Sequence, residues 1–94
     1  MALTFEWDDA KAAENRRKHR VSFAQAAQVF RDPFAVEWID TREAYGEERS
    51  VLLGMSADVL LSVVFTERGD RIRIISARRA TRHEQVHYLR QNAP

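Results

Sequence analysis

The chain has 94 residues, which is enough for one small hydrophobic core and too few for a second. Hydrophobic residues make up 45% and charged residues 31%, with a net charge of +1, as in a globular protein rather than a disordered tail. Because the chain has no cysteine, a disulfide scaffold, cysteine-ligated zinc and thiol catalysis are excluded. We therefore expect a single domain over residues 1–94.

The first elements are predicted to be a short strand and a helix. Residues 5–7, Phe-Glu-Trp, are typical of a short strand. Asp8 or Asp9 can cap a helix that extends to about His19, since acids occupy its first turn and bases its last. The start does not resemble a signal peptide, and the longest apolar run, residues 59–65, is too short to span a bilayer. We expect a cytoplasmic protein with no membrane partner.

A second helix is predicted directly after the first. Ser22 and Gln25 have the spacing of a capping box, so this helix begins at Phe23. It ends before Pro33, because a proline disfavours helical backbone at the residue that precedes it. Two short helices joined by a tight corner follow from these signals.

The next part of the chain is mostly strand. Alternating or continuous apolar residues predict strands at 34–39, 49–55, 59–65 and 71–76. The run 59–65 is apolar almost throughout, which is typical of a central strand. Residues 68–71, Arg-Gly-Asp-Arg, supply hairpin-turn chemistry. In the strand that follows, we expect Ile72, Ile74 and Ser76 to share one face.

A last helix is predicted near the C-terminus. Thr81 and Glu84 form a second capping box, and Val86 and Leu89 have the spacing of an inward-facing pair. The expected fold class is α+β: a short N-terminal strand, two helices, an antiparallel meander of three to four strands and a C-terminal helix, with the helices packed on the sheet.

The same helix contains an H-E-x-x-H motif, formed by His83, Glu84 and His87. This spacing is typical of a zinc hydrolase, in which the glutamate is the general base. Against a zinc site, no His, Asp or Glu follows His87, arginines precede the motif, and Glu84 already belongs to the capping box of Thr81. A zinc hydrolase stays an alternative, and we expect no metal and no cofactor.

Charge is strongly segregated along the chain. Residues 32–58 carry seven acids and two arginines, whereas residues 68–94 carry seven arginines and two acids. A second basic run covers residues 16–20. Such segregation is typical of a surface with one side suited to phosphate, although oppositely charged ends that neutralise each other would give the same pattern.

Three residues in the basic segments have the chemistry for metal-free RNA cleavage. This reaction needs a base for the 2′-hydroxyl, an acid for the leaving 5′-oxygen and cations for the phosphorane charge. His19, at the end of a predicted helix, is the best-placed titrating group, although a solvated helix-end histidine is an equal alternative. Arg78 and Arg79 are candidate phosphate clamps or, alternatively, members of a salt-bridged strand end.

Most of the aromatic residues, Trp38 among them, have the periodicity of core positions and are interpreted as packing rather than base-stacking platforms. Tyr45, in the polar loop after residue 39, and Tyr88, on the last helix, are the two that could contact a base.

A family resemblance is carried by residues in three segments. These segments follow one another in the family's order and cover nearly the whole chain. The segments are Trp7-Asp8, Lys11, Asn15, Lys18-His19, Val21, Phe23 and Ala26; then Arg42, residues 45–49 and Gly54; then residues 66–69 and 71–81, Glu84 and Tyr88. They resemble the signature of the BrnT toxin family, and the stretch Ile-Ile-Ser-Ala-Arg is the most specific part. Arg20 stands where the family usually has glycine, which suits a left-handed helix cap, so we expect a reshaped exit from the first helix.

The resemblance implies a RelE-like fold and an endoribonuclease toxin that acts on free or ribosome-associated RNA. It also implies neutralisation by a BrnA-like antitoxin with a DNA-binding part, and a toxin homodimer within that complex is a further option. The expected catalytic residues are Lys18, His19 and Arg78, and the expected RNA-binding residues are Arg17, Arg68, Arg73, Arg79 and Arg82. The alternative from another class is a non-catalytic module that binds RNA or protein through the same basic surface.

Overall fold

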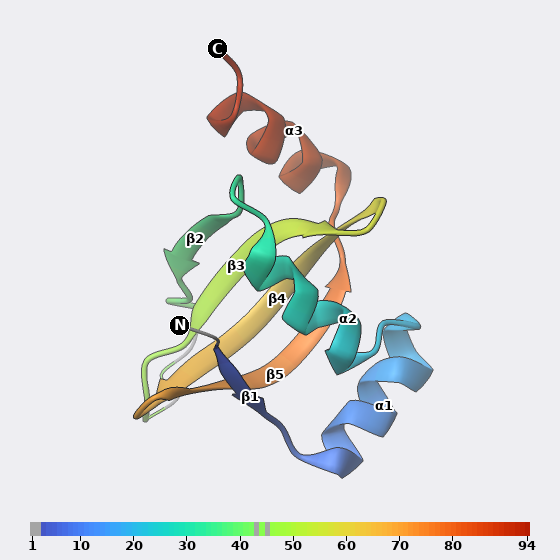
Figure 1. The fold of residues 1–94 in the computed structure, drawn as a ribbon, viewed down its shortest axis with the longest axis vertical. Coiled ribbons are helices and arrows are strands. Elements are labelled where there is room, and N and C mark those ends of the chain that lie inside the picture. Colours follow the sequence, from blue (N-terminus) through green and yellow to red (C-terminus); the bar gives the residue numbers. More distant parts are fainter. Residues whose placement is uncertain (1–2, 43, 45) are drawn as a thin grey trace.

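The computed structural model describes residues 3–42, 44 and 46–94, and its elements follow the predicted order (Figure 1). The helices are α1 (Asp9–His19), α2 (Phe23–Gln28), the short 3₁₀ helix η1 (Val29–Arg31) and α3 (Arg82–Gln91). The strands are β1 (Thr4–Glu6), β2 (Val36–Ile39), β3 (Ser50–Ser56), β4 (Val59–Arg68) and β5 (Arg71–Arg79). The fold is α+β, as the sequence predicts.

All five strands belong to one sheet, in the order β1-β5-β4-β3-β2. Strands β2 to β5 form an antiparallel meander, whereas β1 runs parallel to β5 and pairs only with residues 71–73. The apolar strand β4 lies in the centre, which confirms the prediction for residues 59–65. Gly69, with φ +61°, supplies the left-handed position in the turn between β4 and β5.

The core lies on one face of the sheet, which α1, α2 and η1 cover and which we call the closed face (Figure 1). Its buried residues are Val21, Phe23, Ala26 and Val29 from the helical part, and Leu52, Leu61, Val63, Phe65, Ile72, Ile74 and Ala77 from the strands. Because side chains alternate along a strand, the intervening residues point the other way. That second side, the open face, carries Trp38, Val51, Ser62, Val64, Ser76 and Arg78.

A β-bulge in β5 changes which residues face the core. Phe65 pairs with Ile74, but the preceding residue Val64 pairs with Ser76, so β5 has one extra residue at this point. Ser76 therefore lies on the open face and Ala77, only 1% exposed, joins the core. The expectation that Ser76 shares a face with Ile72 and Ile74 was wrong, because simple alternation does not continue through a bulge.

The helix starts agree with their predicted caps. Asp8 caps α1, and the capping boxes of Ser22 with Gln25 and of Thr81 with Glu84 are both formed. The exit from α1 differs from expectation. Arg20 adopts the left-handed conformation, with φ 57° and ψ 31°, and its N–H still donates to the carbonyl of Arg16 at 2.9 Å. The arginine thus keeps a glycine-like cap, at a conformational cost of about 1 kcal/mol.

Helix α3 lies at one end of the sheet and buries none of its residues (Figure 1). Val86 is 40% exposed and Leu89 is 68% exposed, so the prediction that both point inward was wrong. Their apolar spacing is that of an amphipathic helix, but α3 contacts the end of the sheet rather than the core. None of the helices in the described ranges has the length and apolar character needed to cross a membrane.

Polar contacts from Asp32 hold α3 in place. Its carboxylate accepts the hydroxyl of Tyr88 at 2.6 Å and the N–H groups of Met55 and Phe34 at 2.8 and 2.9 Å. Burial opposes ionisation of Asp32, but these hydrogen bonds outweigh it and lower its pKa. Burial and the contact with Asp32 raise the pKa of Tyr88 to about 12. The same bond to Phe34 forms a turn, so β2 begins at Val36 rather than at residue 34.

Candidate functional site

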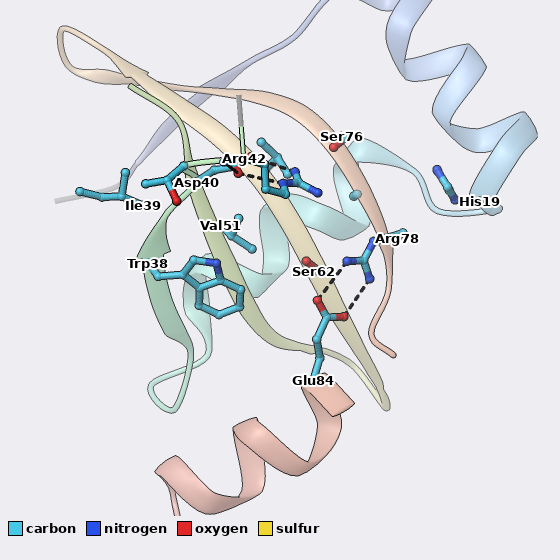
Figure 2. Close-up of a pocket in the computed structure, with 13 residues that line it drawn as sticks. His19, Trp38, Ile39, Asp40, Arg42, Val51, Ser62, Ser76, Arg78 and Glu84 are labelled. Carbon is cyan, nitrogen blue, oxygen red and sulfur yellow. Dashed lines mark hydrogen bonds and ion pairs between the residues drawn. The ribbon is translucent and has the colours of Figure 1, made fainter. Parts of the chain in front are cut away.

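A pocket of about 540 Å³ lies on the open face of the sheet (Figure 2). Its floor is built from a row of paired residues across four strands, namely Trp38, Val51, Val64 and Ser76, and from Ser62 and Arg78, which pair in a neighbouring row. Its walls are His19 at the end of α1, residues 40–42 after β2, and Glu84 in α3. Six elements or their flanking residues thus meet around one concavity of a size typical of small-ligand sites.

Arg78 and Glu84 form a two-pronged ion pair at one side of the pocket. Nη1 of Arg78 donates to Oε1 of Glu84 at 2.8 Å, and Nη2 donates to Oε2 at 3.0 Å. The hydrogen bonds from Arg78 and from the N–H of Thr81 lower the pKa of Glu84 against the opposing effect of burial. Glu84 therefore stays ionised near neutral pH and sets the orientation of the guanidinium.

The ion pair leaves part of the Arg78 guanidinium available. A guanidinium has five N–H donors, of which Glu84 accepts two and the carbonyl of Arg79 accepts a third, from Nη1 at 3.2 Å. The Nε–H and the second N–H of Nη2 have no acceptor within the described part of the chain. Two neighbouring donors of this kind can bind two oxygens of one phosphate.

A second arginine, Arg42, stands on another wall of the pocket. Its Nε and Nη2 donate to the two carboxylate oxygens of Asp40, both at 2.8 Å. The carboxylate of Asp40 is only 1% exposed, whereas the side chain of Arg42 is 67% exposed. The positive charge of Arg42 acts on Arg78, where it partly offsets the rise in pKa that the hydrogen bonds to Glu84 cause. Two cations that repel each other across a pocket favour an anion between them.

Asn15 places the end of α1 beside the pocket. Strand β1 ends before it reaches Ala77, so the edge of β5 is left without a partner strand there. The amide of Asn15 takes that place, because its Oδ1 accepts the N–H of Ala77 at 3.0 Å and its Nδ2 donates to the Ala77 carbonyl at 2.9 Å. His19 lies one helical turn further along α1 and lines the pocket next to β5 (Figure 2).

The other residues expected on α1 and α3 lie outside the pocket. Lys18 is 61% exposed and pairs with Glu14 at 3.7 Å on the helix surface. Arg17 is exposed on α1, and Arg82 is exposed at the first position of α3. Lys18 and His19 are therefore neighbours in sequence, but only the histidine lines the pocket.

Arg78 and Arg79 do not share a face. Arg79 pairs with Leu61, a core residue of the closed face, and lines a separate pocket beside Tyr88 and Leu89. Neighbouring residues of a strand point to opposite sides, so the two arginines cannot hold one phosphate together while β5 keeps this conformation.

The remaining arginines expected to bind RNA lie further along the open face, toward the hairpin between β4 and β5. Arg73 donates from Nη1 to the carboxylate of Glu6 at 2.7 Å, and Arg68 lies 3.4 Å from the carboxylate of Glu47. The hydrogen bond from Arg73 lowers the pKa of Glu6. Arg73 pairs with Thr66 and Arg78 pairs with Ser62, and these two residues of β4 point to the same side, so the open face carries basic residues on both sides of the bulge.

In the folded chain, Glu84 and His87 of the H-E-x-x-H motif contact other parts of the protein. The carboxylate of Glu84 is bound to Arg78 and to the N–H of Thr81. The ring of His87 packs perpendicular to the indole of Trp38, with ring centroids 5.9 Å apart. A glutamate held by an arginine is not free to act as the base on a metal-bound water.

Comparison with known proteins settles the class. A family model described as the ribonuclease toxin BrnT of type II toxin–antitoxin systems matches residues 7–84 of the chain. The chain belongs to the BrnT family. The resemblance drawn from the sequence is thereby confirmed, and with it a ribonuclease activity, an RNA target and an antitoxin protein as partner. No curated protein matches the chain.

Sequence reasoning did not assign a role in the site of this BrnT-family chain to Asn15, Asp40, Arg42 or Trp38. Asn15 and Arg42 belong to the residues that carry the family resemblance, which was the only available signal for them. Of the two tyrosines expected to contact a base, Tyr88 is bound to Asp32 and lines a different pocket. Tyr45 lies outside the described residues.

Proposed function

We propose that the pocket on the open face is the ribonuclease active site and that it cleaves RNA without a metal, by acid–base chemistry. The observation that carries the proposal is the guanidinium of Arg78, which Glu84 orients while two of its N–H donors have no acceptor among the described residues. His19 and Arg42 line the same pocket. A guanidinium that can donate hydrogen bonds to a phosphate, a second cation and an imidazole thus surround one space.

In the proposed reaction the 2′-hydroxyl oxygen attacks the neighbouring phosphorus and the bond to the 5′-oxygen breaks. A base takes the proton of the hydroxyl, and an acid gives a proton to the departing 5′-oxygen. Arg78 and Arg42 neutralise the charge that builds up on the phosphoryl oxygens. His19 is the candidate for one of the two proton transfers, because it lines the pocket and an imidazole can both accept and donate a proton.

We assign binding of the RNA phosphate backbone to the arginines of the open face and to the end of α1. Arg73 and Arg68 extend the basic surface from the pocket toward the hairpin, and Lys18 adds a charge beside His19. Contacts of this type bind phosphates without regard to sequence and weaken as salt is raised. We do not assign Arg79 to this surface, because it pairs with Leu61 and projects to the closed face.

The proposal is tested by comparing two neighbouring arginines. Arg78→Ala should lower the cleavage rate of RNA about 10²-fold, the loss typical for one preorganised charge stabiliser. Arg78→Lys should recover only part of it, because an ammonium cannot form the two-donor contact. The matched control is Arg79→Ala, which removes the same charge on the opposite face and should cost little. Equal losses in both alanine variants, or cleavage that stops in excess EDTA, would contradict the proposal.

We also propose that a BrnA-like antitoxin silences the toxin by covering this open face. The arginines of the pocket and of the hairpin end form a surface that an acidic segment of an inhibitor would complement. Binding there would exclude RNA directly, without a change in the toxin fold.

A further inference from the structure

We propose that the Trp38 end of the pocket is a nucleobase subsite, in which a base next to the cleaved phosphate stacks on the indole. The inference rests on the proposed function, because it takes the same pocket as the RNA site. It adds a recognition element that neither the charge pattern nor the family match contains.

Trp38 differs from the aromatic residues that build the core. On the closed face, Phe30 packs edge to face against both Phe5 and Phe65, and Trp7 packs on Phe23 in the same way. Trp38 lies on the opposite face, at the edge strand β2, and keeps 37% of its surface exposed. The indole therefore presents part of its surface to the pocket, where a ligand can reach it.

One contact fixes the ring without covering it. The imidazole of His87 lies perpendicular to the indole, with centroids 5.9 Å apart and an angle of 84° between the planes. Because α3 carries His87 and Glu84, the same helix orients the indole at one side of the pocket and the guanidinium at the other. A preorganised ring loses little conformational freedom when a base stacks on it.

The floor between the two groups suits a nucleotide. Trp38 stands on β2 and Arg78 on β5, so their backbones are separated by three strand spacings, about 14 Å, across the sheet and by two further residues along it. Figure 2 shows the indole and the guanidinium extending over the sheet from these two sides, with Val51 and Ser62 between them. An apolar, aromatic end and a cationic end in one pocket match the base and the phosphate of RNA.

Fluorescence tests the subsite directly. The chain has two tryptophans, so Trp7→Phe leaves Trp38 as the single indole reporter. Stacking on an indole quenches its emission. Titration with the four nucleoside 3′-monophosphates should quench it, whereas ribose 5-phosphate, which has no base, should leave it unchanged at the same concentrations. Absence of quenching by all four nucleotides would overturn the subsite, and so would equal quenching by ribose 5-phosphate.

Kinetics provide the second arm. Trp38→Leu should raise the KM for a short RNA about fivefold to a hundredfold with little change in kcat, the range expected when one base loses its aromatic partner. Trp38→Phe should restore most of the affinity, because any aromatic face can stack. A variant with leucine whose KM equals that of the parent would overturn the subsite.

Comparison with Arg78→Ala keeps the two proposals apart. If Arg78→Ala abolishes cleavage while Trp38→Leu leaves KM unchanged, the active site stands and the base subsite alone fails. If both variants cleave RNA like the parent, the pocket is not the site of the ribonuclease, and both proposals fall.

Discussion

The side-chain amide of Asn15 bonds both backbone groups of Ala77, as a neighbouring strand would. It also donates to the carbonyl of Val21 at 2.9 Å, so one buried side chain joins α1, the corner before α2 and the free edge of β5. Ala77 is followed by Arg78, and Asn15 is followed one turn later by His19. The contact therefore supports the fold and the proposed site together.

Asn15→Ala should destabilise the fold by about 3 kcal/mol, since it leaves buried backbone groups of Ala77 and Val21 without partners. Urea unfolding measures the change. The control is Asn92→Ala, which removes an exposed amide that also makes two backbone contacts and should cost less than about 0.5 kcal/mol. Similar losses of unfolding free energy in the two variants would show that the buried contacts of Asn15 stabilise the fold no more than exposed ones.

Glu84→Ala should lower RNA cleavage about tenfold or more, because Arg78 loses the carboxylate that orients it. In an Arg78→Ala background the same change should have no further effect. Thr81→Ala is the matched control: it weakens the cap of α3 by about 1 kcal/mol but leaves Glu84 opposite Arg78. Single-turnover cleavage rates of the variants test this prediction. If Glu84→Ala is as active as Thr81→Ala, Glu84 does not position Arg78 for cleavage.

The same ion pair predicts a dependence of stability on pH. Because Arg78 holds the pKa of Glu84 below its ordinary value of 4.5, the contact stabilises the fold above that value and is lost as the pH falls through the lowered pKa. The Tm of Glu84→Gln should therefore fall less than the Tm of the parent when the pH is lowered from about 6 to about 3. Asp32 and Glu6 titrate in both proteins, so the difference reports Glu84. Parallel Tm curves would count against the prediction.

Arg20→Gly should stabilise the fold by up to about 1 kcal/mol, because glycine adopts the left-handed conformation at φ 57° without strain. Arg17→Gly removes an equal charge three residues earlier, inside the helix. It should instead lower the stability by about 1 kcal/mol, because glycine is unfavourable within a helix. Urea denaturation measures both changes: if the m-value is unchanged, a shift of the midpoint reports the change in the free energy of unfolding. A loss of stability in Arg20→Gly would show that the arginine makes compensating contacts.

Arg78→Glu should weaken both RNA cleavage and binding of a BrnA-like antitoxin, whereas Arg79→Glu should affect each much less. The reason is geometric, because only Arg78 lies on the open face that the antitoxin is proposed to cover. Association should also slow as salt is raised, since opposite charges steer the encounter. Binding kinetics over a salt series test this. Tight antitoxin binding by Arg78→Glu at every salt concentration would place the inhibitor elsewhere.

Local signals in the sequence determined where most elements begin. The caps at Asp8, Ser22 and Thr81 involve partners three residues away, so spacing alone identifies them. The hairpin turn at Gly69 and the central strand β4 follow from equally local chemistry, namely a residue free to adopt positive φ and an unbroken apolar run. The fold class, and the basic character of the segment that contains Arg78, were therefore predictable.

The tertiary structure alone decided which side chains meet. Glu84 bonds Arg78 only because α3 turns back at the end of β5, and Trp38 meets His87 across 49 positions of sequence. The bulge that moves Ser76 to the open face depends on the register between β4 and β5, which periodicity within one strand does not contain. Contacts of this kind depend on how whole elements pack and are selected by packing free energy summed over the sheet, and no local pattern encodes that sum.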